Sequence, residues 1–277
     1  MRLFDTHTHI QDEAFDSDRV AVIQRARDAG MAGMIVLGVD VATSQQAVGL
    51  ARANDFVFAA AGCHPHDADK MNDATLDALA ELAQQPDVVA IGEIGLDFYR
   101  NLSSHEKQIE VFQRQLETAR EAGKPVSVHC RDAQGSMLPL IEEWSRSLGG
   151  GLPGGRPLGV MHYFAGDVEL GKRYASLGFM ISVHTSITYP KSDQLRDVAR
   201  RLPLETLVVE TDSPYGAPQS LRGKRNEPAN VLAAVEKIAE VRGEPIERIA
   251  EATTANALRL FGIESRLTQP AGSRTIS

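Results

Sequence analysis

Short apolar segments recur along the whole chain and are separated by longer segments of mixed character. Eight of these apolar segments lie at residues 2–5, 34–38, 56–61, 88–91, 126–129, 158–162, 179–183 and 207–210. Most are almost entirely apolar instead of alternating between apolar and polar residues, which is typical of parallel strands covered on both faces. The pattern therefore predicts eight parallel strands.

The segments between the predicted strands have a helical spacing of apolar residues. At residues 105–121, Ile109, Phe112, Leu116 and Ala119 fall three or four positions apart and share one helical face. Similar patterns predict helices at residues 18–29 and 75–84, and two closing helices packed outside the strands at residues 227–240 and 246–261.

Eight strand–helix repeats predict an α/β fold of the (β/α)8 or TIM-barrel type, with a doubly wound open sheet as the alternative. We expect residues 1–265 to form one barrel domain and residues 266–277 to be a frayed tail. The glycine-rich segment 149–155 is expected to be a connecting loop without a catalytic part.

Composition narrows the classes of protein that remain. The 277 residues include 29 lysines and arginines and 37 aspartates and glutamates, so the formal net charge is −8. This charge argues against a protein that coats DNA, but it is compatible with an enzyme that binds one nucleotide end. Two cysteines exclude a disulfide scaffold. Without a membrane-length apolar run or a signal-type start, we expect a cytoplasmic monomer with no membrane partner.

Histidines gather where the predicted strands end. Seven of the eight histidines lie at or just beyond a predicted strand end, the position of active-site residues in barrels. His7 and His9 are two residues apart on an extended segment, so their side chains point the same way. Four further ligand-type residues follow other strands: Glu93, His129, His162 and Asp212. Six such side chains at one barrel mouth predict two divalent ions with room for water.

Two carboxylates are assigned catalytic roles. Glu93 is flanked by Gly92 and Gly95, which allow close approach, and is the candidate bridge between the ions. Asp212 is the candidate general base, and a helix-capping role is the alternative for either carboxylate. Cys63 and Cys130 are expected to be small buried hydrophobes, because a Cys–His nucleophile would leave the ligand set unexplained.

Other residues near the strand ends suit a phosphate-bearing substrate. Arg222, Lys224 and Arg225 follow the eighth strand, and Arg131 follows His129, so we expect them to contact phosphate oxygens. A solvated basic loop is the alternative for the first three. Further substrate contacts are expected from aromatic and histidine side chains that stack, orient or donate a proton, namely Tyr99, His64 and His66.

Six motifs occur in order between residues 1 and 262, and together they resemble the signatures of TatD-type metal-dependent hydrolases. They read DTHTH at residues 5–9, GCHPH at 62–66, GEIGLDFY at 92–99, HCRDA at 129–133, ETDSPY at 210–215 and RGKRNEPAN at 222–230. Six ordered motifs are far more specific than any one alone. Two segments depart from the family pattern, at residues 161–166 and 181–189. In the second, His184 is unusual, and we expect it to narrow the pocket or touch substrate.

The resemblance implies a distorted TIM barrel of the amidohydrolase superfamily type and a divalent-metal deoxyribonuclease. We expect a 3'→5' exonuclease that acts on single-stranded DNA or a strand end, with magnesium or manganese as working ions and zinc as a substitute in a crystal. By position, His7, His9, Glu93 and Asp212 match the ligands of the first ion. The second-ion set matches Glu93, His129 and His162.

Two rival functions share this ligand set. The first is a hydrolase of the same fold that cleaves an ester or amide, such as an aminoacyl or lactone bond. The second is a metal-binding barrel without catalytic activity, which would have a closed shell of ligands. The strand at residues 88–93 contains no lysine, so a carboxylated-lysine bridge is excluded. A dinucleotide-binding oxidoreductase is excluded because no G-x-G-x-x-G motif follows the first strand.

Overall fold

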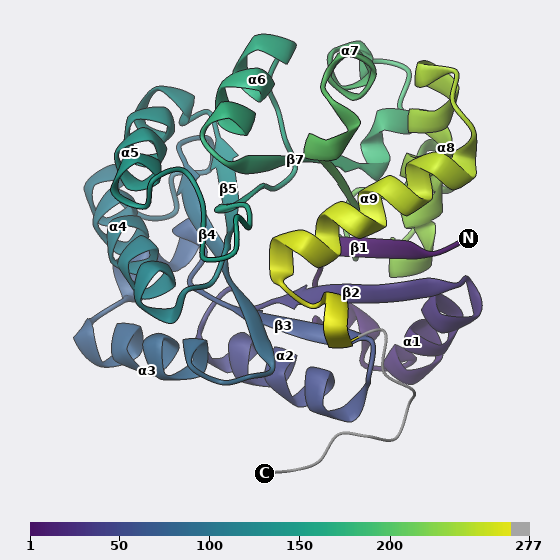
Figure 1. Cartoon of the computed structure of the whole chain (residues 1–277). Coiled ribbons are helices and arrows are strands. Elements are labelled where there is room, and N and C mark those ends of the chain that lie inside the picture. The colour runs from purple at the N-terminus through teal and green to yellow at the C-terminus, as the bar shows by residue number, and fades with distance from the viewer. Residues whose placement is uncertain (267–277) are drawn as a thin grey trace.

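The computed structural model describes residues 1–266, in which eight parallel strands form one sheet in the order β1 to β8 (Figure 1). The strands are β1 Leu3–Thr8, β2 Met31–Leu37, β3 Val57–Ala61, β4 Val88–Asp97, β5 Val126–Arg131, β6 Gly159–Met161, β7 Phe179–His184 and β8 Leu207–Glu210. A parallel bridge between Thr8 and Ser213 brings the two edges together. The barrel prediction is confirmed, and the open-sheet alternative is wrong.

Helices alternate with the strands around the barrel. They are α1 Arg19–Asp28, α2 Val41–Ala53, α3 Asp73–Ala83, α4 His105–Ala122, α5 Gln134–Ser147, α6 Val168–Ser176, α7 Asp193–Arg201, α8 Val231–Arg242 and α9 Ile246–Phe261. Short 3-10 turns are η1 Glu13–Phe15, η2 Pro65–Lys70, η3 Thr185–Thr188, η4 Leu204–Thr206, η5 Gln219–Leu221, η6 Pro228–Asn230 and η7 Glu264–Arg266. Within residues 1–266, no helix combines the length and the apolar character that crossing a membrane requires.

The last helix closes one end of the barrel. Phe4 stacks on Phe58 of β3 and on Phe261 of α9, with ring centroids 6.3 and 6.2 Å apart. These rings belong to a cluster of buried apolar residues that joins several strands to α9. Figure 1 shows α9 crossing the barrel, whereas α8 stands in the outer ring. The prediction that both closing helices pack outside the strands therefore holds for α8, and α9 instead covers the amino-terminal opening. The open end is the carboxyl-terminal one.

The observed strands β1 and β4 are longer than predicted. β4 continues from Ile91 to Asp97, and residues 94 to 97 pair with residues 128 to 131 of β5. The apolar pattern stops at Gly92 and Glu93 because glycine and glutamate are weak strand formers. A Cβ at Gly95 would overlap the carbonyl oxygen of His129, so glycine allows the two strands to approach. Glu93 consequently lies within a strand and not beyond its end.

The glycine-rich loop lies between α5 and β6, where Leu152 forms an antiparallel bridge with Arg156, as expected of a connector. The predicted tail, apart from Arg266, lies outside the described residues. The assignment of residues 1–265 to a single domain stays a prediction, to which the continuous eight-stranded sheet lends support.

Candidate metal centre

The structure brings the six predicted ligand-type residues together at the open end of the barrel. His7 belongs to β1, Glu93 to β4 and His129 to β5, while the other three lie one or two residues beyond the end of a strand. All except the fully buried His7 line a cleft of about 720 Å³. This volume is in the range of pockets that hold small ligands.

Glu93 lies between two groups of imidazoles. Its Oε2 atom is 3.3 Å from Nε2 of His7 and 3.4 Å from Nε2 of His9. The Oε1 atom of the same carboxylate is 2.9 Å from Nδ1 of His129 and 3.6 Å from Nε2 of His162. Each oxygen therefore faces its own pair of nitrogens, as a carboxylate shared by two cations would.

Asp212 lies on the β8 side of the same cluster. Its Oδ1 atom is 3.8 Å from Nε2 of His7, 3.6 Å from Nε2 of His9 and 3.9 Å from Nε2 of His162. The backbone N–H of Asp212 donates to the carbonyl of His7 at 2.9 Å, so the β1–β8 contact fixes its position.

The donor atoms fit divalent cations. Three groups offer ligand atoms that all lie within 4.8 Å of one another: His7 with Glu93 and His162, His7 with His9 and Asp212, and His64 with Glu93 and His129. Imidazole nitrogens and carboxylate oxygens are ligands for divalent transition metals, and carboxylates also suit magnesium and manganese. The Nε2 atoms of His7 and His9 are 3.1 Å apart, close enough for one cation to contact both.

His64 joins the cluster, although the sequence predicted only a substrate or proton-donor role for it. Its Nδ1 atom accepts a hydrogen bond from the backbone N–H of His66 at 3.1 Å, and its Nε2 atom lies 3.5 Å from Oε1 of Glu93. His64 caps η2, and its side chain is 10% exposed. The signal that could have found it is its place after β3, equivalent to the places of the other ligand-type histidines.

Burial and neighbouring charges shift the pKa values of the residues in the centre in different directions. Burial alone would raise the pKa of Glu93, but the surrounding imidazoles, His64 and His7 foremost, bring it well below its ordinary value. Burial lowers the pKa of His7 and of His162 to about 3, so both rings are neutral and able to donate a lone pair. Burial, together with the charges of Glu93 and Glu210, raises the pKa of Asp212 well above its ordinary value.

The pKa values of His9 and His129 are raised, in contrast to those of His7 and His162. Burial alone would lower the pKa of His9, but Glu93 and Asp212 raise it to about 9. For His129, hydrogen bonds to Asp97 and Glu93 likewise outweigh burial and raise the pKa to about 9. The carboxylates therefore favour positive charge at this place, which a bound cation would supply in exchange for protons.

Two further carboxylates support the imidazoles from behind. Oδ2 of Asp97 lies 3.1 Å from Nε2 of His129 and 2.9 Å from Nε2 of His66. Oε1 of Glu210 lies 3.0 Å from Nδ1 of His162. Carboxylates in this position set the orientation and basicity of ligating histidines. Their sequence positions alone indicate no such role.

The predicted basic contacts separate into two groups. Arg131 lines the cleft, and its guanidinium carbon is 3.8 Å from the centroid of the Tyr99 ring. Arg222, Lys224 and Arg225 are not among the described residues that line the cleft. Arg225 instead pairs with Asp18 at 2.7 Å and packs over the ring of Phe15 at 4.5 Å.

His184 lies behind a wall of the cleft, next to Tyr163. His184 is buried and stacks on Tyr163 with ring centroids 3.7 Å apart, and its Nδ1 atom is 2.7 Å from Oγ of Ser186. Tyr163 lines the cleft and His184 does not, so His184 shapes the pocket through the Tyr163 ring.

Burial raises the pKa of Cys63 to about 12, which keeps its thiol protonated and argues against a Cys–His nucleophile.

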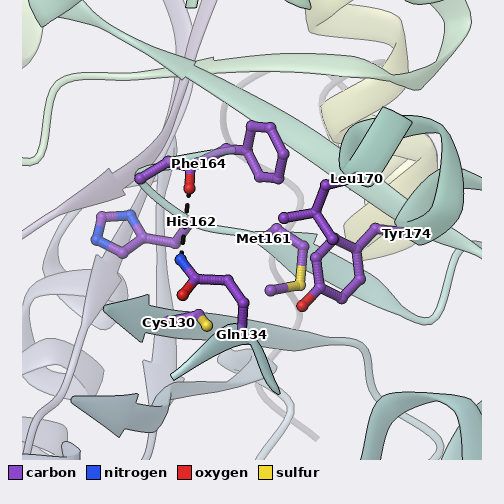
Figure 2. A pocket seen from close by; sticks show the side chains of 8 residues that line it. Cys130, Gln134, Met161, His162, Phe164, Leu170 and Tyr174 are labelled. Carbon is purple, nitrogen blue, oxygen red and sulfur yellow. Dashed lines mark hydrogen bonds between the residues drawn. The ribbon is translucent and has the colours of Figure 1, made fainter. Parts of the chain in front are cut away.

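A second cavity lies on the other side of His162 (Figure 2). Its walls include Met161, Leu170 and Tyr174, and Gln134 donates a hydrogen bond to the carbonyl of Ala165 at 3.4 Å. The cavity holds about 10 Å³, room for about one water molecule. It is too small for a substrate, so the chemistry belongs to the larger cleft.

Comparisons with known proteins agree on one family. Residues 4–262 match the family described as TatD related DNase. An uncharacterized metal-dependent hydrolase from Bacillus subtilis, YabD, is 37% identical over 262 residues, covering 94% of this chain and 99% of the relative. The protein named 3'-5' ssDNA/RNA exonuclease TatD from Escherichia coli is 38% identical over 266 residues, covering 94% and 99%. The crystal structure of the TatD homologue YjjV from Escherichia coli superposes with a TM-score of 0.86 at 32% identity, covering 94% of this chain and 98% of that one.

Proposed function

This chain belongs to the TatD-related DNase family of metal-dependent hydrolases, and from that membership we propose that it removes nucleotides from the 3' end of single-stranded DNA. The names of several relatives include both single-stranded DNA and RNA as substrates, so single-stranded RNA is a second substrate to test. The observation that carries the proposal is the place of Glu93, with one carboxylate oxygen facing His7 and His9 and the other facing His129 and His162.

We assign two divalent ions, magnesium or manganese, to this cluster. His7, His9, Glu93 and Asp212 would hold one ion, and Glu93, His129 and His162 would hold the other, with His64 as a further ligand beside Glu93. When bound, such ions lower the pKa of water and of nearby acids, and they neutralise charge on the attacking and leaving oxygens of a phosphodiester.

The residues around the ions have separate tasks in this proposal. Asp212 accepts the proton of the water that attacks phosphorus, because its carboxylate is buried beside the imidazoles and still borders the cleft. His66 also lines the cleft, and its Nε2 atom is held 2.9 Å from Oδ2 of Asp97. We assign it the proton that the departing 3' oxygen takes up when the phosphorus–oxygen bond breaks.

The ester or amide alternative uses the same water and the same donor set. What favours a phosphodiester is the pair of guanidinium groups in the cleft wall, Arg100 and Arg131, neither of which pairs with a carboxylate in the described part of the chain. A catalytically inert barrel would not need an open cleft beside its ligands. The cytoplasmic location and the monomeric state stay predictions.

The experiment compares substrates on metal-stripped protein to which one ion at a time is returned. With magnesium or manganese, a 5'-labelled single-stranded oligonucleotide should shorten stepwise from its 3' end. Glu93→Gln should abolish this ladder, whereas Glu169→Gln on an exposed helix should leave it unchanged. Hydrolysis of aminoacyl esters or lactones without any shortening of DNA or RNA would establish the alternative.

A further inference from the structure

One side of the cleft carries a basic and aromatic rim. Arg100 and Arg131 line the cleft and follow or end β4 and β5, and Tyr99 lies beside them. The guanidinium carbon of Arg131 is 3.8 Å from the centroid of the Tyr99 ring, and Tyr99 is 57% exposed. A stacked guanidinium keeps its N–H edge free for a phosphate, and an exposed ring keeps one face free for a base.

The β1 side of the cleft carries a carboxylate where the β4 and β5 side carries guanidinium groups. Apart from the proposed metal ligands, the acidic residue that lines the β1 side is Asp12, while Asp67, on η2 after β3, is paired with Lys70. In the sheet order, β1 and β8 stand across the barrel from β4 and β5. A phosphate backbone that left over the β1 side would pass the carboxylate of Asp12, whereas over the β4 and β5 side it meets two guanidinium groups that lack carboxylate partners among residues 1–266.

The rim is attached directly to the candidate metal centre. Oδ1 of Asp97 accepts hydrogen bonds from the backbone N–H groups of Tyr99 at 3.0 Å and Arg100 at 2.8 Å. Oδ2 of the same carboxylate lies 3.1 Å from Nε2 of His129. Because Asp97 is buried, the start of the rim is held at a fixed position relative to the site of hydrolysis.

We propose that the substrate strand leaves the cleft over this rim. Arg100 and Arg131 contact phosphates on the 5' side of the bond that is cleaved, and the exposed face of Tyr99 stacks on a base of that segment. The proposal rests on the nuclease function above and adds to it a path for the strand and a preference for substrates longer than one nucleotide.

The test compares a long and a minimal substrate of the same chemistry. The long substrate is a twelve-residue oligothymidylate, and the minimal one is the p-nitrophenyl ester of thymidine 5'-monophosphate, which has no nucleotide on the 5' side. Arg131→Ala and Tyr99→Ala should each raise KM for the long substrate about tenfold, and change kcat/KM for the minimal one less than about twofold. Tyr99→Phe should behave as the wild type, and Arg131→Lys, which keeps charge but not the planar stack, should fall between.

The chain offers a matched control at the other end of the barrel. The guanidinium carbon of Arg27 lies 4.3 Å from the ring centroid of Phe56, which precedes β3. Arg27→Ala removes the same kind of contact and should change neither substrate's kinetics. The path would be overturned if Arg131→Ala and Tyr99→Ala lowered kcat/KM equally for both substrates, or lowered it for neither. A length-dependent loss in Tyr215→Ala alone would place the exit on the β8 side and would also overturn it.

A binding measurement separates failure of the path from failure of the nuclease function. Fluorescence anisotropy of a labelled oligothymidylate can be followed without turnover, in the presence of calcium. Arg131→Ala should bind more weakly, and the slope of its log binding constant against log salt concentration should fall by an amount equal to about one phosphate contact. This result supports the rim even if no hydrolysis occurs. Wild-type-like binding by that variant contradicts the rim even in an active nuclease.

Discussion

Glu210 places its Oε1 atom 3.0 Å from Nδ1 of His162, while Nε2 of the same ring faces Oε1 of Glu93 at 3.6 Å. The same Glu210 oxygen accepts a hydrogen bond from the backbone N–H of Tyr163 at 2.7 Å. A carboxylate behind a ligating imidazole fixes the ring and strengthens it as a donor. This close contact, which is not a hydrogen bond in the structure, makes Glu210 the candidate positioning residue for His162.

Replacing Glu210 by Gln should weaken manganese binding about 10- to 100-fold, because the amide keeps the shape but loses the charge behind the ring. Isothermal titration of the metal-stripped protein measures this, and circular dichroism checks that the fold is kept. Glu205→Gln, at an exposed place just before β8, is the matched control and should bind metal normally. Unchanged affinity in Glu210→Gln would remove this positioning role.

Asp212→Asn should lower kcat by about 10²- to 10⁴-fold without unfolding the chain, since the proposed base is lost while its volume is retained. Single-turnover hydrolysis of an oligonucleotide gives the rate, and thermal unfolding gives the control. The carbonyl of His7 still accepts from the backbone at residue 212, so the β1–β8 contact should survive. A fully active Asn variant would exclude Asp212 from proton transfer.

His64→Ala should reduce the number of manganese ions bound at a fixed concentration, because Nε2 of His64 lies 3.5 Å from Oε1 of Glu93. Metal content per chain after gel filtration is the readout. His105→Ala serves as a comparison, since His105 stacks on Phe98 at 3.7 Å outside the cluster. If both variants retain the wild-type metal content, His64 is not a ligand.

The two thiols should react slowly in the folded protein. Burial raises the pKa of both Cys63 and Cys130 from 9.0 to about 12, so the reactive thiolate fraction at pH 8 falls from about one in ten to about one in ten thousand. Because a raised pKa disfavours the charged form, the labelling rate by Ellman's reagent should keep rising above pH 9. Unfolding in urea should restore rapid labelling, and equal rates in both states would contradict the expectation.

Several features of the fold and the site could be predicted from local sequence. The apolar segments predict the strands because a parallel strand buried on both faces has no polar positions to spare. The two-residue spacing of His7 and His9 places both side chains on one face, and the structure brings their Nε2 atoms to 3.1 Å. The carboxyl-terminal limit of β4 was missed because its pairing with β5 resumes at Ile94, beyond Gly92 and Glu93, which are weak strand formers and lie outside that register.

The alternation of strand and helix, and the kinds of side chain that follow each strand, can therefore be read from the amino-acid sequence. Which of these side chains meet depends on the folded chain, because closing a barrel joins residues far apart in sequence, such as His64 and His129 around Glu93. The fold likewise pairs Arg225 with Asp18 and places Arg131 at the cleft. The contacts of a basic side chain near a motif depend on the direction of the loop that carries it, and the local sequence pattern does not specify that direction.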